Sequence, residues 1–372
     1  MSKNPFIARR PELAAVEVTI GESSSADVPL DEAAIRRIIE FYGRVAPTGG
    51  GAGDDDMWSV LRQQHFGPLI ELLETADVNA LRDYLAELPR REAGHGSYQG
   101  QPAYDAAHKS GLGRSLNTLN ALFGFAEAVG TMRPRSPEQT STGSPDLDLA
   151  TIVGDLDSAV GFPIVLPPVS TGLLGPIMGD GILHLRHLTA AYLAWRVREL
   201  ARGPLETSVD QLHVCEIGGG AGLAAYYGLA AGVGRWTSVD LPEMGVIQAF
   251  NLMTLLGPDR VHLWGESSTP EHAVSIVSNN IHLDSPTKSD ITINQDSLPE
   301  ISRAEATRYV EALTTSTLWF LSINQEHEAP QTAAAKQLVV GDLADESGDL
   351  NRWYRMPFWL RIGYVEELYQ VG

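Results

Sequence analysis

Cysteine is almost absent from this sequence. Cys215 is the single cysteine among the 372 residues. Because a disulfide needs two thiols, the chain can form none internally, and a reducing compartment such as the cytoplasm is the simplest setting. Cys215 lies within an apolar run, so we interpret it as a core residue rather than a reactive thiol.

Basic residues are also scarce. Lysine and arginine total 27 against 47 aspartates and glutamates, which gives a net charge of −20 at pH 7. Proteins that bind nucleic-acid backbones need a concentrated basic surface, and no long basic run occurs here. The charge argues against a nucleic-acid partner and favours a neutral or cationic small substrate.

Long hydrophobic runs are missing too. The longest apolar stretch without a charged residue, 217–234, is broken by glycines, so we expect no membrane span. Residues 1–20 contain basic and acidic side chains and no continuous apolar segment, unlike a secretory signal. A hydrophobic content of 43% with 20% charged residues instead fits a globular protein.

The most informative stretch is 212–222, where an apolar run ends in a carboxylate and breaks into glycines. Glycine accepts positive φ angles and lets a ligand approach the main chain. The helical composition of residues 223–231 predicts a helix, whose first turn would offer free N–H groups and a positive dipole end. The pattern predicts a strand, a ligand-binding turn and a helix, with these candidate cofactor contacts: Glu216, Gly218, Gly220 and Gly222.

Two cofactors suit such a turn. A dinucleotide requires G-x-G-x-x-G/A and an acid about 20 residues later, as in Gly220, Gly222, Ala225 and Asp240. S-adenosylmethionine is the second candidate. Glu216 favours it, because a carboxylate at the strand tip would repel pyrophosphate but can receive the ammonium group of a methionine moiety. A glycine-rich turn without a ligand is a third interpretation.

The chain changes character near residue 204. Residues 1–204 show mostly helical patterns, including one helix that begins after Asp31 and another over about 182–202. A segment rich in proline and glycine, 162–181, interrupts them and is expected to lie over a site. Residues 205–372 alternate between strands and helices, which is typical of a parallel sheet covered on both faces.

We expect a Rossmann-like α/β domain over 205–372, preceded by a mostly helical domain over 1–204 that lies on the acceptor side. After the first strand, the predicted strands are 235–240, 261–265, 290–294 and 318–324. Residues 273–283 are ambiguous. Short β-prone runs at 338–340 and 364–371 are expected to supply antiparallel edge strands.

Ligands of such sheets bind beyond the carboxyl ends of the strands, where the strand order reverses. Asp240 ends the second strand, so its carboxylate could accept the ribose hydroxyls, with Leu241 beside it. Capping of the next helix is the alternative role for Asp240. Glu266 or Ser267, after the third strand, could meet the adenine amino group, although loop capping is as plausible. Asn294 ends the fourth strand and is a further candidate cofactor contact.

Catalytic candidates follow the fourth and fifth strands. Asp296 leads, because a carboxylate there could hold or deprotonate an acceptor hydroxyl, with helix capping as the alternative. Glu300 follows in the same polar cluster. His327, after the fifth strand, could act as a general base because the pKa of histidine lies near working pH, although an ordinary surface histidine is the commoner case.

Two further groups could face a substrate. His184 and His187 lie three positions apart on a predicted helix with Arg186 between them, and no third residue at a recognisable spacing completes a metal site, so we expect none. The tail mixes aromatic and guanidinium side chains, which stack on sugars and donate forked hydrogen bonds. The candidates from the tail are Arg355, Trp359 and Arg361, although an ordinary core edge would look similar.

Five separated stretches carry a resemblance to a known family. They are 214–227 (VCEIGGGAGLAAYY), 238–243 (SVDLPE), 293–301 (INQDSLPEI), 320–326 (FLSINQE) and 357–369 (PFWLRIGYVEELY). From about residue 154 onward the chain resembles the family of sugar O-methyltransferases within the class I S-adenosylmethionine-dependent superfamily.

The resemblance implies a Rossmann-like fold, S-adenosylmethionine as the methyl donor and a saccharide or glycoside hydroxyl as the acceptor, as in natural-product biosynthesis. It also implies catalytic roles for Asp296 and Glu300 by their positions. A homo-oligomer is compatible with the sequence. Two alternatives stay open: an NAD(P)-dependent oxidoreductase, and a catalytically silent protein that binds S-adenosylmethionine and a protein partner.

Overall fold

A computed structural model describes residues 13, 16, 18–24, 30–46, 57–110, 112–134, 148–166, 169–269, 271–327, 330–332 and 335–372. The helices are α2 (Glu32–Val45), α3 (Met57–His65), α4 (Gly67–Thr75), α5 (Val78–Ala86), α6 (Gly100–Ser110), α7 (Leu112–Val129), α8 (Leu149–Val160), α9 (Leu185–Arg202), α10 (Leu223–Ala230), α11 (Pro242–Leu256), α12 (Asn279–Asp284), α13 (Arg303–Ser316) and α14 (Val340–Ser347).

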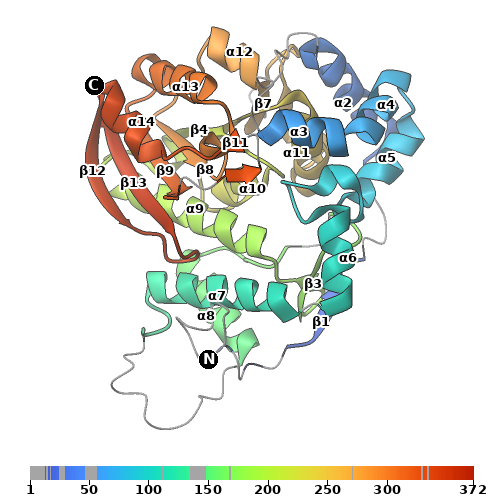
Figure 1. Ribbon diagram of the computed structural model, residues 1–372, viewed down its shortest axis with the longest axis horizontal. Helices are drawn as coiled ribbons and strands as arrows, with labels where there is room; N and C mark the ends of the chain where they lie inside the picture. The colour runs from blue at the N-terminus through green and yellow to red at the C-terminus, as the bar shows by residue number, and fades with distance from the viewer. Residues whose placement is uncertain are drawn as a thin grey trace.

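The main sheet has eight strands in the order β12-β13-β9-β8-β4-β5-β7-β6 (Figure 1). Its strands are β4 (His213–Ile217), β5 (Arg235–Asp240), β6 (Val261–Leu263), β7 (Val274–Ser278), β8 (Ile291–Gln295), β9 (Trp319–Gln325), β12 (Leu350–Pro357) and β13 (Tyr364–Val371). The strands from β6 to β9 in this order run parallel, whereas β13 is antiparallel to both of its neighbours. The Rossmann-like fold predicted from the sequence is therefore confirmed.

Three short strands form a second sheet in the order β1-β2-β3. They are β1 (Ile20–Glu22), β2 (Leu174–Met178) and β3 (Gly181–Ile182), so the segment rich in proline and glycine pairs with the N-terminal region. A hairpin of β10 (Pro330–Thr332) and β11 (Ala335–Lys336) completes the described strands.

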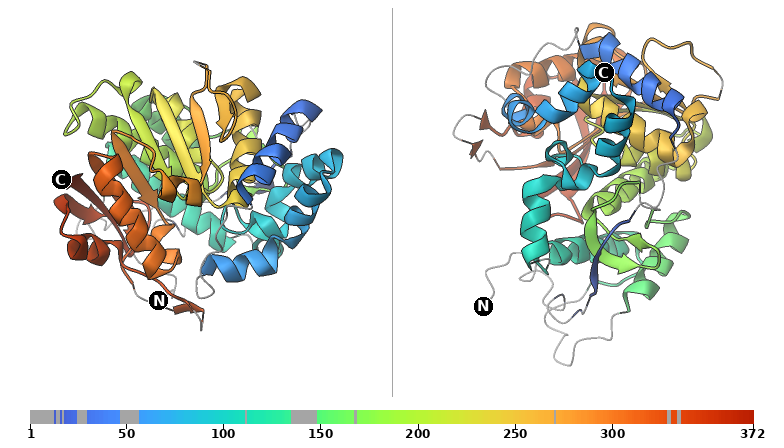
Figure 2. Two further views of the ribbon diagram at one scale, coloured as in Figure 1. Left: turned by 90° about the horizontal axis from the view of Figure 1, so that it is seen from above. Right: turned by 90° about the vertical axis from the view of Figure 1, so that its right-hand side faces the viewer.

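Helices cover both faces of the main sheet (Figure 2). One hydrophobic cluster joins α2, α9 and α11 to the sheet, and a second contains residues of α13 and α14. Successive side chains of β4 point to opposite faces of the sheet, so the core is divided into two clusters. Val214 belongs to the first cluster and Cys215 to the second. Cys215 is fully buried, as a core residue should be. The first cluster spans the boundary expected near residue 204, so the N-terminal helices and the sheet share one core.

The third predicted strand, 261–265, exists but does not lie beside β5. Residues 261–263 form the edge strand β6, and the neighbour of β5 is β7, within the stretch that the sequence left ambiguous. Serines alternate with buried aliphatic residues along β7, which weakens its hydrophobic signal. The run at 338–340 was also misassigned, because Val340 begins α14 and the edge strand is β12. Asp31 caps α2 as predicted, accepting a hydrogen bond from the Ala34 N–H at 2.8 Å.

Candidate functional site

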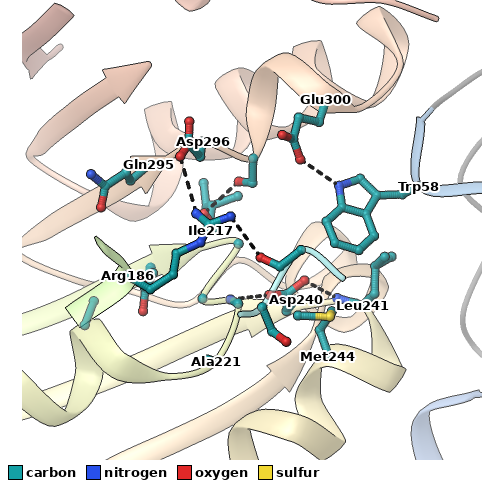
Figure 3. Close-up of a pocket in the computed structure, with 18 of the residues that line it drawn as sticks. Trp58, Arg186, Ile217, Ala221, Asp240, Leu241, Met244, Gln295, Asp296 and Glu300 are labelled. Carbon is teal, nitrogen blue, oxygen red and sulfur yellow. Dashed lines mark hydrogen bonds and ion pairs between the residues drawn. The ribbon is translucent and has the colours of Figure 1, made fainter. Parts of the chain in front are cut away.

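A cavity of about 420 Å³ lies beyond the carboxyl ends of the parallel strands (Figure 3). The turn after β4 and the tips of β5, β7 and β8 form its floor, and its walls include residues of α3, α9, α13 and the segment 95–99. Strand order reverses between β4 and β8, since the chain moves outward from β4 to β5 and later returns to the other side of β4. The cavity therefore lies at the point where open α/β sheets bind ligands.

The glycine turn after β4 is shaped by its neighbours. Gly218 has φ +80°, and a Cβ there would meet Ser297 Oγ at 2.1 Å. A Cβ on Gly219 would meet Ser238 Oγ at 1.9 Å. Gly220 differs, because its φ is +55° but a Cβ would meet nothing within 4 Å. The first two glycines are required by packing, whereas Gly220 presents bare main chain to open space.

Glu216 lines the cavity from beneath this turn. Its side chain is 5% exposed, and Oε2 accepts a hydrogen bond from the Trp236 indole N–H at 3.0 Å. Burial raises the pKa of Glu216 to about 8, because desolvation penalises the charged form. A cation placed beside this carboxylate would restore its charge.

Asp240 ends β5, the strand next to β4 in the sheet. Oδ2 accepts hydrogen bonds from the Gly220 N–H and from Gln248 Nε2, both at 2.9 Å, and Oδ1 accepts one from the Leu241 N–H at 2.8 Å. Burial raises the pKa of Asp240 to about 7. Asp240 and Leu241 both line the cavity, as the sequence predicted.

The residue beside Asp240 on the next strand is not the one expected. Asn279 follows β7, is 3% exposed and lines the cavity. Glu266 instead follows the edge strand β6, where both of its oxygens bind Arg37 of α2 at 2.9 Å. Ser267 is exposed, and neither residue lines the cavity. Asn279, rather than Glu266 or Ser267, therefore lies at the strand tip next to Asp240.

Amide side chains connect the tips of β4, β8 and β9. Asn294 Nδ2 donates to the Ile217 carbonyl at 2.9 Å, and Asn324 Nδ2 donates to Asn294 Oδ1 at the same distance. Asn324 Oδ1 accepts from the Asp296 N–H at 3.0 Å. Asn294 is fully buried and does not line the cavity, so it holds the strand tips together from below.

Asp296 is held between two arginines. Its φ is +69°, an uncommon value for a residue with a Cβ. Oδ2 forms an ion pair with Arg361. It also lies 3.5 Å from Arg186 Nη1, as Figure 3 shows. Arg186 also donates to the Gly96 carbonyl at 3.2 Å. Arg361 of the C-terminal tail and Arg186 of α9 thus both bind Asp296, the leading catalytic candidate from the sequence.

Glu300 lies one turn further along the same loop. Its Oε2 accepts a hydrogen bond from the Trp58 indole N–H at 3.2 Å. Burial, and then the neighbouring charge of Asp296, raise the pKa of Glu300 to about 8. The indole packs against Gly96, where a Cβ would meet Trp58 Cη2 at 2.6 Å. Trp58 was not found from the sequence, because no spacing relates α3 to the β8 loop.

His95 is a second residue that the sequence analysis missed. It lines the cavity beside Gly96, and its ring stacks on His65 of α3 with centroids 5.1 Å apart. Burial, and then the positive charges of His65 and Arg186, lower the pKa of His95. The imidazole is therefore neutral near pH 7, the form that can accept a proton.

Several predicted residues lie outside this cavity. His184 caps α9, where Nδ1 accepts from the Arg186 N–H at 3.2 Å, and His187 is buried with its pKa lowered by burial to about 4. His327 is exposed, Arg355 pairs with Glu326 and Glu367, and Trp359 is 36% exposed. Of the residues named on α9 and the tail, the structure brings Arg186 and Arg361 to the site.

The cavity is strongly acidic. Five carboxylates line it, from Glu216, Asp240, Asp296, Glu300 and Glu305. Among the lining residues of the described chain, Arg186 is the single lysine or arginine. This balance suits a ligand that carries positive charge. The described residues include no group of three or more histidine, cysteine, aspartate or glutamate side chains arranged to hold a metal ion.

No family model and no curated protein matches the chain. Among solved structures, the mitomycin 7-O-methyltransferase MmcR is 14% identical with a TM-score of 0.37, over 92% of this chain and 94% of that one. Magnesium protoporphyrin IX methyltransferase from Synechocystis PCC 6803, solved with bound SAH, is 15% identical (TM-score 0.34; 52% and 90% covered). An O-methyltransferase family protein from Burkholderia thailandensis is 13% identical (TM-score 0.32; 50% and 60% covered). The likeness concerns the fold, so the functional argument rests on the residues of this chain.

Within the part of the chain that the structure describes, no helix combines the length and apolarity that crossing a membrane requires.

Proposed function

We propose that this protein is an S-adenosylmethionine-dependent O-methyltransferase that acts on a hydroxyl of a sugar or a glycosylated small molecule. The observation that carries the proposal is the arrangement around Gly220. Bare main chain faces open space between two acids, the buried Glu216 and the half-buried Asp240, at the topological switch point of the sheet. A ligand with a cationic amino-acid end and a ribose fits these groups.

Each part of the cofactor can be matched to residues that line the cavity. Glu216 would receive the ammonium group, Asp240 the ribose hydroxyls, and Asn279 the adenine edge, with Leu241 against the ring. Gly220 would let the cofactor approach the main chain, because nothing lies within 4 Å of where its Cβ would be, whereas a Cβ on Gly218 or Gly222 would meet Ser297 or Leu252. When bound, S-adenosylmethionine supplies a methyl group on a positively charged sulfur, which an acceptor oxygen attacks in line.

The opposite side of the cavity would hold the acceptor. Asp296, fixed by Arg361 and Arg186, would accept a hydrogen bond from the reacting hydroxyl and orient its oxygen. His95, neutral and part of the cavity wall, would take the proton as the oxygen–carbon bond forms. Glu300 and Trp58 would bind the rest of the acceptor. His327, being outside the cavity, has no part in this scheme.

The saccharide acceptor is supported by the resemblance of residues 154–372 to sugar O-methyltransferases and by the polar acceptor side of the cavity. Calorimetric titration with S-adenosylhomocysteine and with NADH tests the cofactor, and we expect binding of the first alone. Incubation with S-adenosylmethionine labelled at the methyl group and a panel of glycosides then tests transfer. NADH binding without S-adenosylhomocysteine binding would favour the oxidoreductase alternative, and cofactor binding with no transfer to any glycoside would favour a silent binding protein.

A further inference from the structure

The two acids of the β8 loop differ in how their charge is compensated. Asp296 forms ion pairs with Arg361 and Arg186. Both arginines are close enough to Glu300 to influence its pKa, yet neither forms an ion pair with it, and no other lysine or arginine of the described chain does. A half-buried carboxylate with no cationic partner is unfavourable unless a ligand supplies the cation.

An aromatic wall adjoins this carboxylate. Trp58 lines the cavity, and its indole N–H is directed at Glu300 Oε2 (Figure 3). Contact with Gly96 and a tilted contact with Phe66, at 6.5 Å between ring centroids, fix the indole on its other sides. Tryptophan is the aromatic side chain whose face attracts cations most strongly, and a desolvated site increases the attraction.

Other residues of the cavity are proposed to bind the cofactor. Glu216 and Asp240 flank the glycine turn, whereas Trp58 and Glu300 come from α3 and the β8 loop. Figure 3 shows Trp58 facing Glu300 on one side of the pocket and Arg186 facing Asp296 on the other. The amine-binding chemistry of Glu300 is thus separate from the hydroxyl-orienting chemistry of Asp296.

We propose that the acceptor carries a protonated amine, as an amino sugar does, which binds the Glu300 carboxylate beside the indole of Trp58. This inference rests on the proposed methyltransferase function and names its substrate class. The amine is not the methylated group. It anchors the acceptor so that a hydroxyl on the same ring or a neighbouring one reaches Asp296 and His95.

Matched glycosides test the proposal. The protein is first saturated with S-adenosylhomocysteine and then titrated calorimetrically with methyl glycosides that differ at one ring position: amino, hydroxyl or N-acetylamino. We expect at least one amino member to bind about tenfold more tightly than its hydroxyl partner, and the uncharged N-acetyl member to lose that advantage. Titration in buffers of different ionisation enthalpy should show proton release with the amino member, because the ammonium group ionises Glu300.

Glu300→Gln is the decisive variant, because glutamine keeps the size of the side chain and an oxygen for the Trp58 N–H while removing the charge. It should abolish the amino preference and the proton release while S-adenosylhomocysteine still binds. Glu346→Gln, at an exposed pair with Arg303, is the matched control and should keep both. Trp58→Leu should reduce the amino preference in part.

Several outcomes would overturn the inference. One is equal or weaker binding of every amino member with S-adenosylhomocysteine bound, and another is an amino preference that survives in Glu300→Gln. A third is loss of S-adenosylhomocysteine binding in Glu300→Gln, which would assign this carboxylate to the cofactor. Failure of the wild-type protein to bind S-adenosylhomocysteine would instead contradict the proposed function itself.

Discussion

Asp240 accepts a hydrogen bond from the backbone N–H of Gly220 at 2.9 Å, although the two residues are 20 positions apart in the chain. This bond joins the tip of β5 to the glycine turn after β4. It shows that the spacing noted in the sequence corresponds to a direct contact, and it holds the carboxylate at the glycine turn, where we propose that the ribose binds.

Asp240→Asn should weaken binding of S-adenosylhomocysteine by about tenfold or more, because hydrogen bonds to a charged group contribute roughly 1.5–3 kcal/mol each. The amide has nearly the same shape, so the fold should survive. Calorimetry measures the affinity. Asp342→Asn, on the exposed face of α14, is the control, and equal losses in both variants would remove Asp240 from the ribose site.

Gly220→Ala should abolish cofactor binding while lowering the free energy of unfolding by about 1–2 kcal/mol, the usual cost of a left-handed residue with a Cβ. The new methyl group would occupy the open space beside the turn. Gly348→Ala is matched to it, since Gly348 has φ +72°, equally open surroundings and a position remote from the cavity. Denaturant unfolding and calorimetry should show similar destabilisation in both variants and a binding defect in Gly220→Ala alone.

Asp296→Asn should lower kcat far more than it lowers cofactor affinity, because we propose that Asp296 contacts the acceptor rather than the cofactor. A reduction of about 100-fold is in the range expected for a misplaced acceptor. Steady-state kinetics on a glycoside substrate and a separate titration with S-adenosylhomocysteine distinguish the two effects. Unchanged turnover would exclude Asp296 from the reaction.

The pH profile of kcat/KM should report His95. The lowered pKa of His95 means that activity should fall as pH drops below the ordinary histidine range near 6.5, since protonation removes the base. His95→Gln should remove this acidic limb of the pH profile, the fall in activity at low pH, together with most of the turnover. His65→Gln removes a neighbouring positive charge, so it should raise the pKa of His95 and move the limb to higher pH. A limb unaffected by either substitution would assign the base to another residue.

Stability should depend on pH through Glu216. Because burial raises the pKa of Glu216 to about 8, the folded state holds a proton that the unfolded chain releases near pH 4. The contribution of protonated Glu216 to the free energy of unfolding is fully present below pH 4 and is lost as pH rises through about 8. Thermal unfolding of the ligand-free protein should therefore show Glu216→Gln gaining Tm relative to the wild type between pH 5 and 8.5. A constant difference across that range would contradict a protonated Glu216.

Much of the sheet could be predicted because its strands are short apolar runs that end in glycine or polar residues. The limits of β5 were predicted to the residue, and those of β8 and β9 within one position. One exception was β7, because its serines dilute the apolar pattern and its neighbour β6 presents a clearer one. Sequence reasoning then sought the adenine contact at Glu266 rather than at Asn279.

The acceptor side was harder to predict, because its residues come from segments with no fixed spacing between them. Asp296 and Arg361 were both named, but nothing in the sequence paired them. Trp58 and His95 were not named at all. Each lies in a helical or irregular region whose local pattern only indicates packing, and each reaches the cavity because α2 and α9 dock the N-terminal segments against the sheet.

The sequence by itself determined the fold class and the glycine turn with its two acids, because these depend on contacts between neighbouring residues and on the spacing from one strand to the next. The tertiary structure decided which residues face the acceptor, which acids have cationic partners and which histidine lines the cavity. Burial and ion pairing depend on segments that are distant in the chain, so no local pattern can specify them.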